Sequence, residues 1–148
     1  MDYDFFMAKA IELAKKAYKK DEVPVGAIIV KDGKVIASAI NRRQSKRQAT
    51  FHAEILAINK ACKKLKDFRL CGTTMFVTLE PCAMCLGAIM NARIDNLVFG
   101  ASINKENVIT SEELSKRCGL NHNLNIVKEI KKDECEALVT SYFAEKRK

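Results

Sequence analysis

The chain has 148 residues, of which 48% are apolar and 30% are charged, a composition typical of a soluble globular protein of one domain. Its longest apolar runs, such as CAMCLGAIM, are about half the length of a membrane span, and its acidic start differs from a secretory signal. We therefore expect a cytoplasmic protein with no membrane partner. The net charge of +8 suits a nucleic acid partner, although a solvated lysine-rich surface would give the same value.

The first half of the chain predicts a helix, a hairpin and a second helix. Apolar residues at helical spacing favour a helix over residues 3–19. Residues 24–30 and 34–40 have the pattern of two strands, and the sequence KDG between them favours a hairpin turn with a positive φ at Gly33. A polar, basic loop over residues 42–50 leads into a helix over residues 52–65.

The second half alternates strands and helices. We expect strands at 74–80, 96–100 and 124–130, the last at a sheet edge, and a helix at 81–92 whose first turn contains Pro81. Shorter helical patterns follow at 110–119 and 133–146, with capping pairs at Thr110 and Glu113 and at Asp133 and Glu136. This order predicts a three-layer α/β/α fold with a mixed sheet of about five strands, in a single domain over residues 1–148.

Two cysteines at the start of the helix over 81–92 predict a metal site. Cys82 and Cys85 are three residues apart, so both sulfurs point the same way, and the helix N-terminus favours their thiolate forms. This spacing is found in zinc sites and in redox pairs, and only the zinc site needs further ligands. His52 is the natural third ligand, provided that its helix lies beside the first on the same face of the sheet.

The number of ligands separates a structural zinc site from a catalytic one. Structural zinc is normally held by four protein ligands, whereas three leave an open position. Cys62 and Cys135 follow apolar helical patterns and are expected in the core. Cys118 and His122, four residues apart, remain an alternative ligand pair.

Glu54 has a predicted role beside such an open site. It lies two residues after His52, so it does not share a helix face with this histidine and is a poor co-ligand. A first-turn carboxylate next to the metal can instead move a proton between an activated water and a leaving group. The alternative is an acid that only interacts with the helix dipole.

HAE followed about thirty residues later by PCAMC resembles the zinc-dependent nucleoside and nucleobase deaminases. The segments FVTLEPCAMCLGAIMNARIDNLVFGA, GLNHNLNIVKEI and DECEALVTSYFAEKR are similar to the bacterial tRNA-specific adenosine deaminases. The resemblance implies a cytidine-deaminase-like fold, zinc on His52, Cys82 and Cys85, and Glu54 as the general acid and base. It also implies a homodimer that converts adenosine to inosine at the wobble position of tRNA anticodons. By the same resemblance, Asn41 binds the nucleotide's sugar, and the backbone around Ala53 receives the purine edge.

Two segments depart from the pattern of these deaminases, and both are expected to contact the substrate. The family commonly has D-P-T-A before HAE, where this chain has QATF, and it often has Arg-Asp and a glycine-rich loop where this chain has SINKENVITSEEL. The zinc chemistry therefore transfers from the family, whereas the RNA contacts do not.

Basic side chains close to the predicted site suit a phosphate backbone. The candidates for RNA contact are Arg42, Arg43, Lys46, Arg47, Phe143 and Arg147. A frayed helix end also accounts for the basic residues at positions 146–148, and the helical position of Phe143 favours the core. Two rivals to the tRNA deaminase remain, namely a deaminase of free guanine or cytosine and a non-catalytic zinc module that binds nucleic acid.

Overall fold

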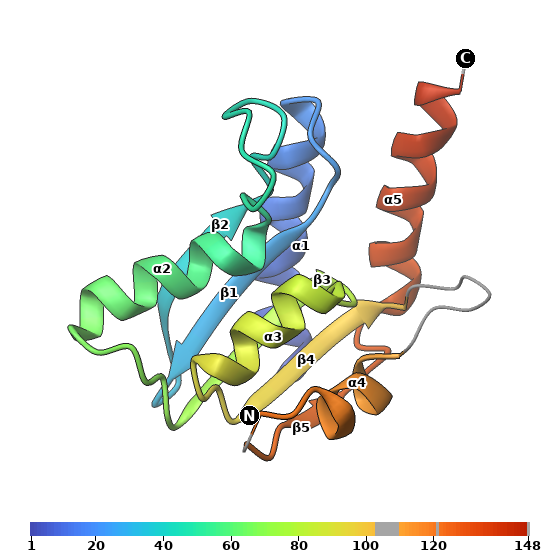
Figure 1. Ribbon diagram of the computed structural model, residues 1–148. Coiled ribbons are helices and arrows are strands. Elements are labelled where there is room, and N and C mark those ends of the chain that lie inside the picture. The colour runs from blue at the N-terminus through green and yellow to red at the C-terminus, as the bar shows by residue number, and fades with distance from the viewer. Residues whose placement is uncertain (103–109, 121, 148) are drawn as a thin grey trace.

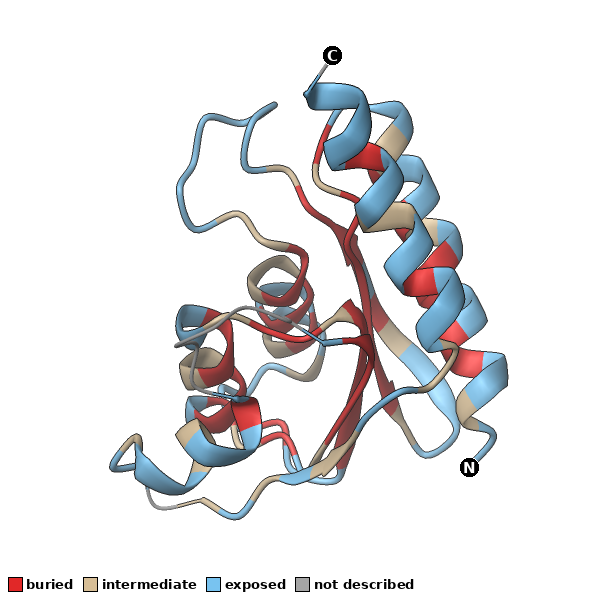
Figure 2. Ribbon diagram, turned by 90° about the vertical axis from the view of Figure 1, so that its right-hand side faces the viewer, coloured by how far each residue is buried: buried red, intermediate tan, exposed pale blue. Residues whose placement is uncertain are grey.

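The computed structural model describes residues 1–102, 110–120 and 122–147, and these residues form one five-stranded mixed sheet between two layers of helices (Figures 1 and 2). The strands follow the order β2 (Lys34–Ile40), β1 (Gly26–Lys31), β3 (Thr73–Leu79), β4 (Asn96–Ala101) and β5 (Asn125–Val127). β1 is antiparallel to both of its neighbours, whereas β3, β4 and β5 are parallel. The predicted three-layer fold with a mixed sheet is confirmed.

The helices divide between the two faces of the sheet. α1 (Tyr3–Lys19) and α5 (Lys132–Lys146) cover one face, and α2 (Ala53–Leu65), α3 (Ala83–Asn91) and α4 (Ser111–Arg117) cover the other (Figure 2). Each layer encloses an apolar core of its own: Phe6 and Met7 of α1 pack toward Phe76, whereas Leu86 and Ile89 of α3 pack toward Leu97. None of the helices in the described ranges is long and apolar enough to cross a membrane.

Local sequence signals explain where several elements begin and turn. The side chain of Asp2 accepts a hydrogen bond from the backbone N–H of Phe5 at 3.1 Å and so caps α1. Asp32 and Gly33 join β1 to β2 with φ values of 50° and 75°, the conformation of the two-residue hairpin turn that KDG predicted. Thr110 caps α4 by accepting from the N–H of Glu113 at 3.2 Å.

Three predicted details are wrong. Pro81 lies before α3, because Cys82 has the extended backbone of an N-cap and the helix begins at Ala83. Asp133 and Glu136 do not cap α5, since this helix begins at Lys132 after a left-handed residue, Lys131, that makes no side-chain cap. The last strand is at the sheet edge as predicted, but its pairing with β4 spans only Asn125–Val127.

The strand directions bring the ends of three strands together at one end of the sheet, where a site can form. β2 and β3 both run antiparallel to β1, so their carboxyl ends lie at the end of the sheet where β1 begins. Asn41 directly follows β2, Glu80 directly follows β3, and Val25 directly precedes β1. Residues from distant parts of the sequence therefore meet at this end of the sheet. Many α/β proteins bind ligands outside the carboxyl ends of their strands.

Candidate active site

The N-termini of α2 and α3 meet at the end of the sheet where β2 and β3 finish, and they bring together one histidine and two cysteines. His52 is the N-cap of α2 and Cys82 is the N-cap of α3, and Cys85 is fully buried one turn into α3. Nδ1 of His52 lies 3.7 Å from Sγ of Cys82 and 3.5 Å from Sγ of Cys85. The predicted convergence of the two helix starts is confirmed.

These three side chains fit a zinc ion. Their ligand atoms all lie within 4.8 Å of one another, and no other such group of three or more ligands occurs among the residues that the structure describes. Tetrahedral zinc with Zn–S of about 2.3 Å and Zn–N of about 2.0–2.1 Å separates sulfur from nitrogen by about 3.6 Å. The observed sulfur–nitrogen distances of 3.5 and 3.7 Å agree with this value.

The two thiols differ in acidity. A hydrogen bond from the Cys85 thiol, assisted by the charge of nearby His52, lowers the pKa of Cys82 to about 5, although burial acts against this change. The pKa of Cys85 is raised, first by its hydrogen bond to Cys82 and then by burial. This lowering favours the thiolate of Cys82, the form in which cysteine binds metals.

The alternative ligand pair has other partners. His122 Nε2 lies 2.6 Å from the backbone carbonyl oxygen of Ile94, and Cys118 Sγ lies 3.4 Å from Sδ of Met90. Cys135 is buried in the core beneath α1 and α5, as predicted, and Cys62 is partly buried against the core on the other face of the sheet. Within the described ranges, the ligand group therefore holds three residues and no fourth.

Glu54 lies beside the ligands and is almost completely buried. It is the second residue of α2 and is 4% exposed. Burial raises its pKa, while a favourable charge interaction with His52 and a hydrogen bond with Cys85 act in the opposite direction. A raised pKa brings a carboxyl group closer to the value that suits a general acid and base.

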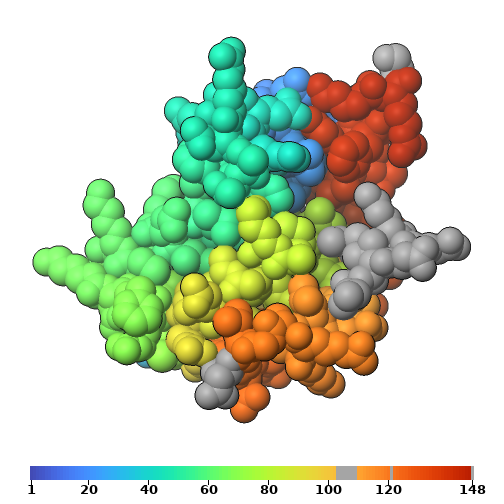
Figure 3. Space-filling model, viewed as in Figure 1, coloured from blue at the N-terminus to red at the C-terminus, as the bar shows by residue number. Residues whose placement is uncertain are grey.

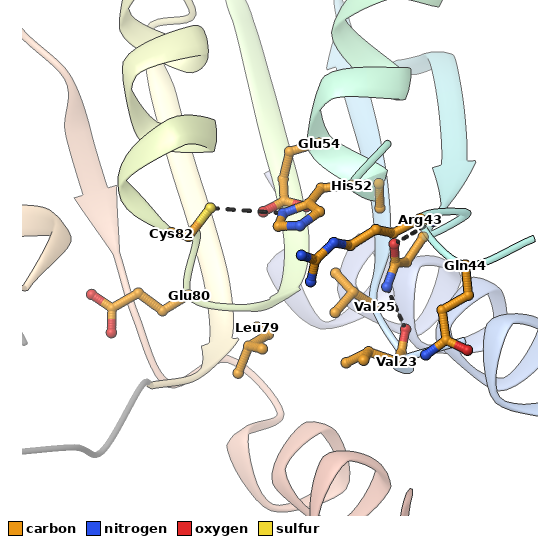
Figure 4. Close-up of a pocket in the computed structure, with 11 residues that line it drawn as sticks. Val23, Val25, Arg43, Gln44, His52, Glu54, Leu79, Glu80 and Cys82 are labelled. Atoms are coloured by element: carbon orange, nitrogen blue, oxygen red, sulfur yellow. Dashed lines mark hydrogen bonds between the residues drawn. The ribbon is translucent and has the colours of Figure 1, made fainter. Parts of the chain in front are cut away.

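His52, Cys82 and Glu54 open onto a cavity of about 380 Å³ (Figure 4), and fully buried Cys85 lies behind its wall. Its lining combines an apolar wall with polar groups from the loop that follows β2. The lining residues are Val23, Val25, Asn41, Arg43, Gln44, His52, Ala53, Glu54, Leu79, Glu80 and Cys82. A cavity that combines an apolar wall with converging polar groups is typical of a binding site for a small organic molecule.

Asn41 and Ala53 both line this cavity, as expected of substrate-binding residues. Asn41 Nδ2 donates to the carbonyl oxygen of Val23 at 3.3 Å, and Oδ1 accepts from the N–H of Arg43 at 3.2 Å. An asparagine amide has two donors and two acceptor sites, so each end retains hydrogen-bonding capacity for a ligand. The N–H of Ala53 belongs to the first turn of α2, where backbone donors have no partner within the helix.

The basic candidates are divided between two elements. Arg43 lines the cavity, whereas Arg42 lines a neighbouring groove and Lys46 and Arg47 are exposed on the loop. Arg147 is the C-cap of α5, and Phe143 of the same helix is 42% exposed, so the expectation of a core position for Phe143 is wrong. Most of the divergent segment 102–114 lies outside the described residues.

Sequence reasoning missed several lining residues. The apolar wall of Val23, Val25 and Leu79 has no signal beyond a strand pattern. Glu80 directly precedes the PCAMC motif, and as an acid at the end of a buried strand it could have been recognised as unusual. It is 7% exposed, and its Oε2 accepts from the N–H and the hydroxyl of Ser111 at 2.8 and 2.7 Å, which ties the cavity wall to α4.

Comparison with known proteins agrees with this geometry. The MafB19-like deaminase family matches residues 1–138. A tRNA-specific adenosine deaminase of Bacillus subtilis is 41% identical over 146 residues, covering 98% of this chain and 91% of the relative. That of Buchnera aphidicola is 39% identical over 146 residues and covers 97% and 95%.

A solved structure from a study of A-to-I editing by tRNA:A34 deaminases at the wobble position of transfer RNA is also similar. It has a TM-score of 0.84 at 37% identity and covers 90% of this chain and 98% of the other. A guanine deaminase from Bacillus subtilis has a TM-score of 0.66 at 38% identity, with 69% of this chain and 66% of the other covered. The chain therefore belongs to the MafB19-like deaminase family.

Proposed function

We propose that this chain is a zinc-dependent hydrolase that deaminates adenosine to inosine at the wobble position of tRNA anticodons. The observation that carries the proposal is a group of three metal ligands, two of which line one cavity together with buried Glu54. The relatives named tRNA-specific adenosine deaminase, which match nearly the whole chain, support tRNA as the substrate.

In this proposal His52, Cys82 and Cys85 would hold a zinc ion. When bound, the ion would supply Lewis-acid activation of water. Glu54 takes a proton from the attacking water and delivers it to the amino group, which leaves C6 of the adenine ring as ammonia. The apolar wall of Val23, Val25 and Leu79 excludes bulk water from the ring. Adenosine and one water thus give inosine and one ammonia.

Substrate binding is assigned to the residues around the cavity mouth. Asn41 hydrogen-bonds to the sugar of the target nucleotide, and the backbone at Ala53 receives the purine edge. Arg42, Arg43, Lys46 and Arg47 on the loop, with Phe143 and Arg147 on α5, contact the RNA. The loop and the C-terminal end of α5 lie at the same end of the molecule, which supports a joint surface (Figures 1 and 2).

We also propose that the protein is cytoplasmic, where tRNA is its partner, and that it acts as a homodimer, as the resemblance to tRNA deaminases implies. Sedimentation of the purified protein tests the dimer, which should have twice the chain mass of 16.6 kDa.

The deciding experiment is incubation of the zinc-loaded protein with four substrates: an adenosine-wobble tRNA, free adenosine, guanine and cytosine. Inosine in the tRNA with release of ammonia is the expected result. The second candidate is a free guanine deaminase, favoured by the similarity to the Bacillus subtilis guanine deaminase. Activity on a free base alone would establish this second function and overturn the first.

A further inference from the structure

A buried carboxylate lies at the end of α1, outside the group of metal ligands and Glu54. Glu22 is 1% exposed. The helix ends with Asp21 in a left-handed conformation, φ 60°, so that the N–H of Glu22 donates to the carbonyl oxygen of Ala17 and that of Asp21 donates to Tyr18. This is the Schellman arrangement, and it fixes the backbone from which the Glu22 side chain projects.

The Glu22 carboxylate holds the basic loop over residues 42–50. Its Oε1 accepts from the N–H of Gln44 at 2.9 Å, and its Oε2 accepts from the N–H of Ser45 at 2.6 Å. Hydrogen bonds to a charged acceptor are stronger than those between neutral groups. One carboxylate thus binds two consecutive backbone donors of a loop that is 22 residues away in the sequence.

The remaining backbone hydrogen bonds of this part of the loop are internal. The N–H groups of Arg43, Lys46, Arg47 and Gln48 donate to acceptors within residues 41–44. Among the hydrogen bonds between described residues, Glu22 is the group distant in sequence that binds the backbone of residues 43–48, whose other backbone bonds reach only positions 41–51. The side chains at these positions are exposed, so little apolar burial assists it.

The loop that Glu22 holds forms part of the cavity wall through Gln44 and its neighbour Arg43. Arg43 and Gln44 line it, and Figure 4 shows both side chains beside Val23 and Val25. Figure 3 shows the loop, in teal, projecting at the top of this face. A loop that moves freely must be ordered when a ligand binds, and this ordering reduces affinity.

We propose that Glu22 is a positioning residue, whose carboxylate fixes the loop so that Arg43 and Gln44 are preorganised for RNA binding. The proposal rests on the proposed deamination of tRNA. Glu22 touches neither the metal ligands nor the target base in this scheme, and it acts through the loop backbone. Removing it changes substrate binding more than turnover.

Glu22→Gln tests the proposal, because the amide has the same shape and replaces one accepting oxygen with a donor that faces a backbone N–H. The loop has trypsin sites at Arg42, Arg43, Lys46 and Arg47, and cleavage reports the open population. We expect cleavage there to accelerate about tenfold and KM for an adenosine-wobble tRNA to rise about tenfold, while kcat changes less than about threefold. The matched control is Glu12→Gln at an exposed glutamate of α1 that pairs with Lys15, and it should leave all three values unchanged.

Unchanged cleavage in Glu22→Gln would overturn the proposal, whatever the substrate of the enzyme is. Faster cleavage with an unchanged KM would overturn the role in binding. Hydrogen exchange of the wild-type protein provides a test that needs no variant. The amides of Gln44 and Ser45 should exchange at least about tenfold more slowly than those of exposed Ala49 and Thr50, and equal rates would contradict the proposal. If wild-type protein leaves tRNA unmodified, the proposed function fails, while cleavage and exchange still test the loop contact.

Discussion

Nδ1 of His52 lies 3.5 Å from Sγ of Cys85, although 33 positions separate the two residues in the sequence. Their contact depends on two helices that start at the same end of the sheet. The site is therefore a product of the tertiary fold, and changes to its residues should have separable effects on metal binding, chemistry and stability.

Cys82→Ser should remove the metal. A serine hydroxyl is a much poorer zinc ligand than a thiolate, so zinc content should fall from about one ion per chain to a small fraction of that value. Metal analysis after dialysis, together with thermal unfolding, measures the effect. Cys71→Ser, at an exposed cysteine outside the ligand group, is the control and should retain zinc. Full zinc occupancy in Cys82→Ser would contradict the assignment.

Glu54→Gln should retain zinc and lose activity. The substitution keeps the shape of the side chain but removes its proton transfer, which contributes about 10²- to 10⁴-fold to rate in enzymes. Single-turnover deamination of tRNA and metal analysis of the same sample separate the two effects. The role of Glu54 is refuted by wild-type turnover in this variant.

Arg43→Ala should weaken tRNA binding in a salt-dependent way. If Arg43 contacts one phosphate, the fall of log affinity with log salt should become less steep by about one in Arg43→Ala. Binding measured between about 50 and about 200 mM salt gives this slope. Lys34→Ala, at the hairpin turn of the same sheet, should leave the slope as it is. Equal slopes for Arg43→Ala and wild type would exclude a phosphate contact.

Gly100→Ala should destabilise the fold. A Cβ atom at this position of β4 would lie 2.3 Å from Sγ of Cys135 and 2.9 Å from the carbonyl oxygen of Ile130. Overpacking of this kind costs about 1–3 kcal/mol in the free energy of unfolding. Gly87→Ala is a matched control, because its Cβ would meet nothing within 4 Å and alanine stabilises a helix by about 0.8–1.0 kcal/mol relative to glycine. Urea unfolding of both variants should give opposite signs.

Because Cys135 is buried, the free energy of unfolding should depend on pH in the alkaline range. Burial raises the pKa of this thiol from 9.0 to about 12. Above pH 9 the unfolded chain therefore loses this proton before the folded protein does, and stability falls as the pH rises toward 12. The difference in unfolding free energy between wild type and Cys135→Ala, measured at pH 7, 9 and 10.5, should shrink with rising pH. A constant difference would contradict the predicted linkage.

Local patterns predicted the elements and the cysteine pair of the ligand group because both have short-range signals. The hairpin follows from Asp32 and Gly33, and the metal site follows from the spacing of Cys82 and Cys85. The start of α5 was wrong because Lys131 adopts a left-handed conformation that its residue type does not favour. The contact of Glu22 with Gln44 and Ser45 has no local signal, since it depends on where one helix ends relative to a distant loop.

The strand directions have a consequence for how such a protein can diverge. The polar residues of the cavity follow the carboxyl ends of β2 and β3, and the buried centre of the sheet contributes mainly apolar packing. Both segments in which this chain departs from similar deaminases also follow strand ends, one after β2 and one after β4. Recognition and folding are thus encoded by largely separate sets of residues. Under the proposed function, the loops can accumulate substitutions that alter the preferred nucleic acid while the scaffold and its ligand group are inherited intact.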